Sequence, residues 1–90
     1  MLDNQRPCPR PGYQMEILDG EIILFHPDSR KIFHSNSSGA LIWQLCDGQR
    51  TVADISHILS ETYPDAAQQI QRDVRDTLRV FAEHGAIMWL

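Results

Sequence analysis

Cysteine is scarce in this sequence, and long apolar runs are absent from it. The two cysteines, Cys8 and Cys46, form no CxxC pair, which argues against a disulfide framework or a redox motif. The five glycines are isolated, so there is no glycine-rich loop to bind phosphate. No apolar run approaches the roughly 18 residues of a transmembrane helix, and the polar N-terminus has no signal-peptide core. We therefore expect a cytoplasmic protein that does not bind to the membrane.

Basic residues are outnumbered as well. The 90 residues contain 8 Lys+Arg and 12 Asp+Glu, and the formal net charge of -4 argues against charge-driven binding to nucleic acid or anionic membranes. Three prolines within five positions predict that residues 1–12 form a flexible, proline-rich arm. Residues 13–90 then form one small domain, in which a deep active site is difficult to enclose. A binding module without catalytic activity or cofactor is expected.

Alternating apolar residues after position 12 predict a small antiparallel sheet. The dipeptide Asp19-Gly20 favours a tight hairpin turn, and the apolar run Glu21–His26 is typical of a middle strand. A second turn is expected at residues 27–30. The third strand, Lys31, Ile32, Phe33 and His34, is short and starts with a lysine, as edge strands often do. The N-terminal half is therefore predicted to be a three-stranded meander.

Helical spacing of apolar residues predicts three helices after the sheet. The first follows capping candidates at Asn36, Ser37 and Ser38 and places Leu41 in an apolar stripe that ends before Asp47-Gly48. The second begins with a capping box from Thr51 to Asp54, and its buried stripe runs through Tyr63. The third is capped by Asp65, extends to about His84, and precedes a short strand at residues 86–90. The fold class is α+β, with a winged helix-turn-helix-like order of elements.

Three arginines lie on one flank of the third predicted helix. Arg72, Arg75 and Arg79 form a local basic ridge beside the apolar stripe. This ridge is either an ordinary solvated face with ion pairs from Asp76 to Arg79 or Arg72, or a site that recognises carboxylates through the planar arginine fork. Spacing alone leaves both interpretations open.

The histidines and cysteines do not predict a metal site or a catalytic centre. His26, His34, His57 and His84 lie in different predicted elements, and none is paired at i, i+4 on a helix. His26 and His34 bracket the second hairpin, where they can meet only if the register brings them together. Cys46 falls on a helical core stripe and is predicted to be a small buried apolar group. We expect no bound metal.

A longer motif resembles a known family. Residues 38–55, SGALIWQLCDGQRTVADI, are similar to the hallmark of the PqqD-like family, in which Ile-Trp precedes Leu-x-Asp-Gly and then Thr-Val. Further on, Asp73-Val74, Leu78 and Gly85-Ala86-Ile87 resemble the family's closing pattern. The resemblance spans residues 13–90 and implies a non-catalytic recognition element for ribosomally made peptides.

The resemblance also implies a site and partners. Such domains bind the leader of a precursor peptide and present it to a modifying enzyme, here expected to be a radical SAM enzyme. The leader adds as a strand beside the third strand and lies against the third helix. Carried onto this sequence, the peptide-binding residues are Lys31, Ile32, Phe33, His34, Arg72, Arg75, Leu78, Arg79 and Ala82.

Two alternatives stay open at this point. A winged-helix DNA-binding regulator would use the third helix, with Arg72, Arg75 and Arg79, against DNA. The acidic total and the interleaved Asp73 and Asp76 count against nucleic acid as a partner. An exposed edge strand also allows a homodimer to form by strand pairing. The class of precursor peptide is not specified by the sequence.

Overall fold

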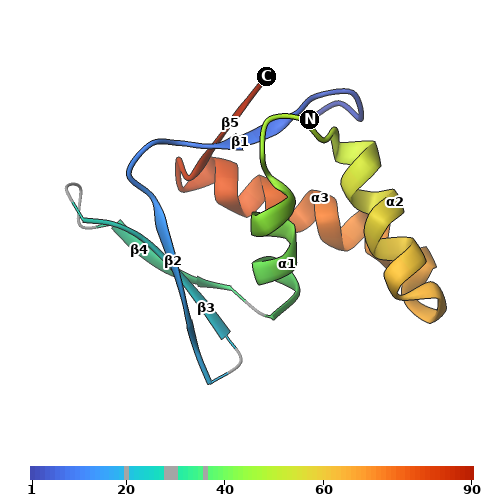
Figure 1. Cartoon of the computed structure of the whole chain (residues 1–90), viewed down its shortest axis with the longest axis horizontal. Coiled ribbons are helices and arrows are strands. Elements are labelled where there is room, and N and C mark those ends of the chain that lie inside the picture. The colour runs from blue at the N-terminus through green and yellow to red at the C-terminus, as the bar shows by residue number, and fades with distance from the viewer. Residues whose placement is uncertain (20, 28–30, 36) are drawn as a thin grey trace.

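The computed structural model describes residues 1–19, 21–27, 31–35 and 37–90, with only the backbone for residues 18, 31–35 and 37. It is a mixed α+β domain (Figure 1). The strands are β1 (Pro7–Pro9), β2 (Gln14–Leu18), β3 (Glu21–His26), β4 (Lys31–Ser35) and β5 (Ile87–Trp89). The helices are α1 (Ser37–Leu45), α2 (Val52–Thr62), the 3-10 helix η1 (Pro64–Ala66) and α3 (Ala67–Glu83).

The expected three-stranded antiparallel sheet is present, in the order β2-β3-β4. Its register places Ile17 opposite Ile22 and Phe33 opposite Leu24. Asp19 has φ 52, the left-handed conformation that the predicted hairpin turn requires. Gly20, the turn predicted at residues 27–30 and the capping candidate Asn36 lie outside the described residues, apart from Pro27.

The proline-rich segment is the main correction to the predicted fold. We expected a flexible arm, but Pro7–Pro9 form a strand that pairs antiparallel with β5. Arg6 and Leu90 exchange backbone hydrogen bonds of 3.0 and 2.8 Å, and the amide of Arg10 donates to Ala86 O at 2.9 Å. Antiparallel strands use the amides of alternate residues, so Pro7 and Pro9 occupy positions that need no N–H.

The same segment continues across the start of α2. The amide of Val52 donates to Gln5 O at 3.0 Å, and that of Ala53 donates to Asp3 O at 3.1 Å. The first amides of a helix have no partner within it, so these carbonyl groups satisfy donors that would otherwise need water or a cap. Pro7, which is buried, also accepts from the amide of Gly48 at 2.9 Å. Residues 3–10 are therefore an integral part of the domain.

The predicted capping box of α2 is confirmed. The Thr51 hydroxyl accepts from the Asp54 amide at 3.0 Å, and the Asp54 carboxylate accepts from the Thr51 amide at 3.0 Å. Helix α2 ends at Thr62, directly before Tyr63 and Pro64, as expected. Gly48 has φ 77, a left-handed conformation in the turn after α1 that favours glycine.

Helix α3 begins later than predicted. Asp65 lies in η1 and does not cap the helix; Ala66 is the N-cap, and no side chain bonds there. The reason is Pro64, which opens a short 3-10 turn in which the Ala66 amide donates to Tyr63 O at 3.0 Å. The C-terminal end agrees with the prediction, because α3 ends at Glu83 and Gly85 follows with φ 74.

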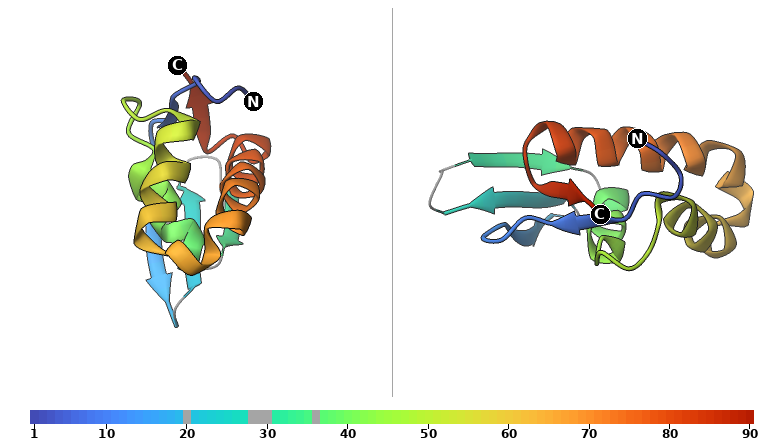
Figure 2. Two further views of the ribbon diagram at one scale, coloured as in Figure 1. Left: turned by 90° about the vertical axis from the view of Figure 1, so that its right-hand side faces the viewer. Right: turned by 90° about the horizontal axis from the view of Figure 1, so that it is seen from above.

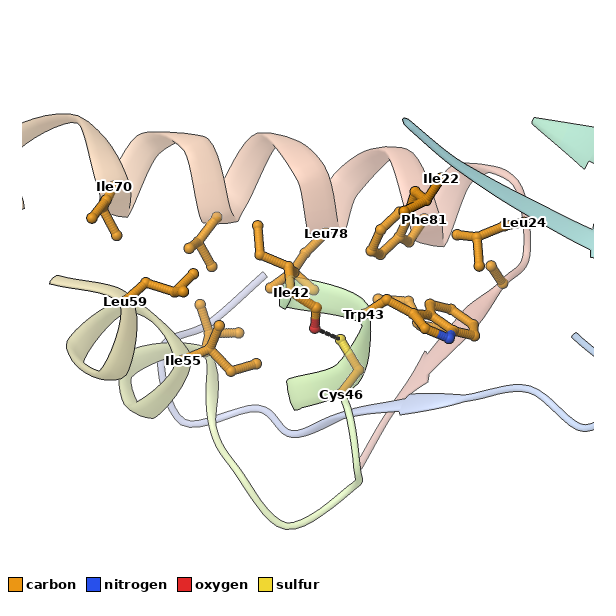
Figure 3. Packing of buried hydrophobic residues seen from close by; sticks show 14 residues of the cluster. Ile22, Leu24, Ile42, Trp43, Cys46, Ile55, Leu59, Ile70, Leu78 and Phe81 are labelled. Carbon is orange, nitrogen blue, oxygen red and sulfur yellow. Dashed lines mark hydrogen bonds between the residues drawn. The ribbon is translucent and has the colours of Figure 1, made fainter. Parts of the chain in front are cut away.

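The core lies between the sheet and the three helices. Figure 3 shows Ile22 and Leu24 of β3 packed near Phe81 of α3 and Trp43 of α1. The Trp43 and Phe81 rings meet edge to face, with centroids 5.6 Å apart. No helix among the described residues is long and apolar enough to cross a membrane. This core fixes the positions of α3 and the sheet, and so the geometry of the site between them.

Candidate functional site

Strand β4 is an edge strand that lies on the α3 side of the sheet. Within the described part of the chain, β4 is paired only with β3. Both views of Figure 2 place β4 on the same side of the molecule as α3. One row of its backbone N–H and C=O groups is therefore available to another strand. This edge contains the predicted residues Lys31, Ile32, Phe33 and His34.

The two flanks of α3 face different parts of the molecule. Asp73 lines a pocket with Ser38 and Leu41 at the start of α1, only a few residues after β4 ends. Arg75, two residues further along α3 and so on the opposite flank, pairs with Asp3 of the N-terminal segment. In the left view of Figure 2, the N-terminus lies at the top of the molecule and the sheet extends toward the bottom. The Asp73 flank therefore faces the end of β4.

The predicted basic ridge is exposed at Arg72 and Arg79, half-buried at Arg75, and partly paired. The Arg75 guanidinium donates to the Asp3 carboxylate, and Arg79 Nη1 lies 3.3 Å from Asp76 Oδ1. Arg79 is 62% exposed at its side chain, and Arg72 is exposed as well. The pair between Arg79 and Asp76 is one of the intrahelical pairs expected for an ordinary solvated face. The structure does not bring Arg75 to the β4 edge.

Leu78 is a correction to the predicted site. Its side chain is 0% exposed and lies in the core beside Phe81 (Figure 3), so it presents no open surface to a ligand. The physical reason is that Leu78 lies on the same apolar stripe as Val74 and Phe81, which α3 turns toward α1. Ala82 is half-buried and packs against the same core.

An open pocket of about 370 Å³ lies between α1, the end of α2 and the first half of α3. The buried residues Ile42, Ile70 and Val74 line it, together with the partly buried Ala66. Asp73 is the one charged residue among the described residues that line it. The pocket is mostly apolar, with a single carboxylate.

Sequence reasoning missed the residues around this pocket. Leu41 and Tyr63 were predicted to lie in buried stripes, but they are 37% and 49% exposed and line the opening. Val80, seven residues and so two turns after Asp73, lies on the same flank and is 41% exposed. A signal was available in the spacing, since Asp73 and Val80 share a flank opposite Arg75. Which flank faces β4 depends on tertiary packing.

The histidines do not converge. The register places His26 opposite Lys31 and His34 opposite Ile23, so the two residues that bracket the hairpin are not cross-strand partners. Within residues 1–19, 21–27, 31–35 and 37–90, no group of three or more His, Cys, Asp or Glu side chains is placed to hold a metal ion. Burial raises the pKa of the Cys46 thiol to about 12, with smaller contributions from Asp47 and Cys8. Cys46 therefore stays a neutral thiol.

Comparison with known sequences identifies the family. Residues 21–87 match the sequence profile of coenzyme PQQ synthesis protein D (PqqD). This chain belongs to the PqqD family. A PqqA binding protein of Rahnella aquatilis is 34% identical over 93 residues, covering 100% of this chain and 90% of its own length. PqqA binding protein 1 of Pseudomonas putida is 33% identical over 89 residues, covering 94% of this PqqD-family chain and 93% of its own length.

A solved structure shares the fold of this PqqD-family chain. TbiB1 in complex with the TbiA(beta) leader peptide superposes with a TM-score of 0.72 at 22% sequence identity. The match covers 89% of this chain and 93% of TbiB1. The two chains therefore share their fold over most of their length.

Proposed function

We propose that this protein binds a ribosomally made precursor peptide of the PqqA type along the free edge of β4. One observation carries the proposal: an unpaired strand edge faces the side of α3, in a chain whose relatives are PqqA binding proteins. TbiB1, which shares the fold, is itself bound to a leader peptide. An extended peptide gains orientation and affinity from backbone hydrogen bonds when it is added to a sheet.

The proposed peptide lies between β4 and the Asp73 flank of α3. Lys31, Ile32, Phe33 and His34 supply the backbone hydrogen bonds, and Val80 supplies exposed apolar surface on α3. Arg72, Arg79 and Ala82 lie outside the Asp73 flank and stay predicted contacts of a peptide that extends past it. Arg75 joins them only by leaving Asp3.

We further propose that the protein is not an enzyme and presents the peptide to a modifying enzyme in the cytoplasm. The support is that the relatives are named for binding PqqA. A radical SAM enzyme is the proposed partner. The winged-helix comparison belongs to the same proposal, with the sheet as the wing and α3 as the ligand-facing helix. The relatives give no support to the alternative of a DNA-binding regulator.

Adjacent proline substitutions test the added strand. In an antiparallel pair, successive backbone amides point to opposite sides of a strand, so only one of Ile32 and Phe33 aims its N–H at the free edge. We expect that one of Ile32→Pro and Phe33→Pro keeps the fold and loses binding to a synthetic PqqA peptide in calorimetric titration. The other is expected to disrupt pairing with β3 and to lower the thermal midpoint.

Ile32→Ala and Phe33→Ala serve as controls, because alanine removes the side chain but keeps the backbone amide that proline lacks. If the proline variant that keeps the fold binds the peptide as the wild type does, β4 is not the docking strand. The same samples, examined by sedimentation without peptide, show whether the free edge also pairs two copies of the chain. A dimer that dissociates when peptide is added is expected if both use this edge.

A further inference from the structure

The pocket between α1, α2 and α3 has the features of a site for a side chain of a ligand. Its volume of about 370 Å³ lies in the range of small-ligand pockets, and its deepest walls are buried core residues such as Ile42 and Val74. Leu41 and Tyr63 stand at its opening with much of their apolar surface exposed. Exposed apolar residues gathered around a pocket mark a binding surface more often than residues scattered singly.

The pocket continues the line of the β4 edge. Strand β4 ends at Ser35, α1 begins at Ser37, and Ser38 lines the pocket. On the other wall, Val80 and Asp73 follow one flank of α3 from the sheet toward the pocket. A peptide added to β4 that continues past Ser35 therefore passes the pocket opening.

The described termini of this chain do not fill the pocket. Strands β1 and β5 hold them together at the end of the molecule where α2 begins (Figure 1). The pocket lies at the opposite end of α2, beside Tyr63. The described termini are therefore not candidates to occupy it, and the only charged group in the described lining is the Asp73 carboxylate.

We infer that this pocket receives one large apolar side chain of the precursor peptide, next to a lysine or arginine of the peptide that pairs with Asp73. The inference rests on the proposed function and adds an anchor to it. The pocket fixes where the added strand stops, because backbone pairing alone allows a peptide to slide along β4 in steps of two residues. Opposite charge at Asp73 selects the neighbouring residue and the direction of the peptide.

Filling the pocket tests the anchor. Ala66 lines the pocket, whereas the next residue, Ala67, is exposed and does not line it. Ala66→Phe therefore fills the pocket, and Ala67→Phe is its matched control. We expect Ala66→Phe to weaken binding of a synthetic PqqA peptide by about tenfold or more, as removal of an interface anchor does, and Ala67→Phe to leave the Kd unchanged.

Peptide variants identify the side chain that enters. Each large apolar residue of the PqqA peptide is replaced by alanine in turn and titrated against wild type and Ala66→Phe. One replacement is expected to weaken binding to wild type by about tenfold and to have no further effect on Ala66→Phe, because both changes remove the same contact. Independent effects of every replacement would overturn the inference.

The carboxylate is tested separately. Asp73→Asn is compared with Glu83→Gln, which alters an exposed carboxylate on the same helix that does not line the pocket. Only Asp73→Asn is expected to weaken binding, and its effect is expected to vanish with a peptide whose neighbouring lysine or arginine is replaced by glutamine. An equal effect of both variants would contradict a local pair.

The outcomes separate this inference from the proposed function. Failure of the wild type to bind the peptide would overturn the proposed function. Binding by wild type and by folded Ala66→Phe with equal Kd would overturn the anchor alone. If circular dichroism shows that Ala66→Phe does not fold, Leu41→Ser at the exposed rim of the pocket replaces it as the test. Leu41→Ser is expected to weaken peptide binding, and unchanged binding would overturn the anchor.

Discussion

Asp54 makes the stability of the start of α2 depend on pH. The Thr51 amide and hydroxyl bond to its carboxylate and hold its pKa below the ordinary value, with smaller contributions from His57 and Arg50. A carboxyl group with a lowered folded pKa stabilises the fold above its unfolded pKa of about 3.9, and that contribution is lost as pH falls through the folded value. Part of the acid sensitivity of the protein therefore comes from this cap.

We expect Asp54→Asn to lower the thermal midpoint at neutral pH and to flatten its dependence on pH in the acid range. The difference between variant and wild type is expected to shrink as pH falls from about 4 through the lowered folded pKa, below which the carboxylate is protonated in both states. Thermal unfolding followed by circular dichroism between neutral and acid pH measures both effects. Asp65→Asn, at an exposed position that caps no helix, serves as the control. Parallel curves for wild type and Asp54→Asn would contradict this prediction.

Cys46 is a structural residue, as the sequence predicted. Its Sγ, just after α1, donates to Ile42 O of that helix at 3.1 Å (Figure 3), and a pKa of about 12 keeps the thiol protonated near neutral pH. In a Cys8→Ala background, we expect a thiol reagent to label Cys46 only as fast as the protein unfolds, because the thiolate is the reactive form. Labelling in denaturant gives the rate for an accessible thiol. Native labelling at that same rate would show that Cys46 is not protected.

At the scale of elements, the N-terminal segment contributes more to the stability of the domain than its proline-rich composition suggests. Its carbonyl groups accept from two amides at the start of α2, and β1 pairs with β5. We expect deletion of residues 2–9 to lower the free energy of unfolding by at least about 2 kcal/mol, since each backbone group that loses its partner costs roughly 1–3 kcal/mol when buried. Urea unfolding measures the loss. If the truncated protein is as stable as the full chain, the prediction of a flexible arm is correct and this account of the segment is wrong.

Local signals in the sequence were sufficient for most of the elements. Alternation and Asp19-Gly20 predicted β2 and β3, and the Thr51 to Asp54 spacing predicted the start of α2. Strand β1 was missed because the lack of an N–H in proline was taken to exclude a paired strand. Whether that N–H is needed depends on pairing with β5, almost the whole chain away.

The site was less predictable than the fold, for a related reason. The β4 edge follows from strand order, so it was predicted. The face of α3 that lies opposite β4 depends on how the helix is rotated about its axis. The periodicity of the α3 sequence defines two flanks but does not determine which one faces the sheet. The family resemblance assigned the arginine flank to the site, but Arg75 contacts Asp3 and the Asp73 flank faces the end of β4.

At the scale of the molecule, the termini and the ligand surface occupy separate ends. Strands β1 and β5 tie both termini together beside the start of α2, while the β4 edge and the pocket lie toward the sheet and the end of α2 (Figure 1). A peptide can therefore bind without displacing the strands that hold the domain together. The end that carries the termini stays accessible to the modifying enzyme in the proposed complex.

Backbone amide exchange with and without a saturating PqqA peptide tests the central claim most directly. If the peptide is added as a strand, amides of β4 that point away from β3 become protected, and so do those that face the pocket at the start of α1. The amides at the start of α2 and in β1 are expected to exchange as before, because their acceptors do not change. Tight peptide binding without new protection in β4 would contradict the account.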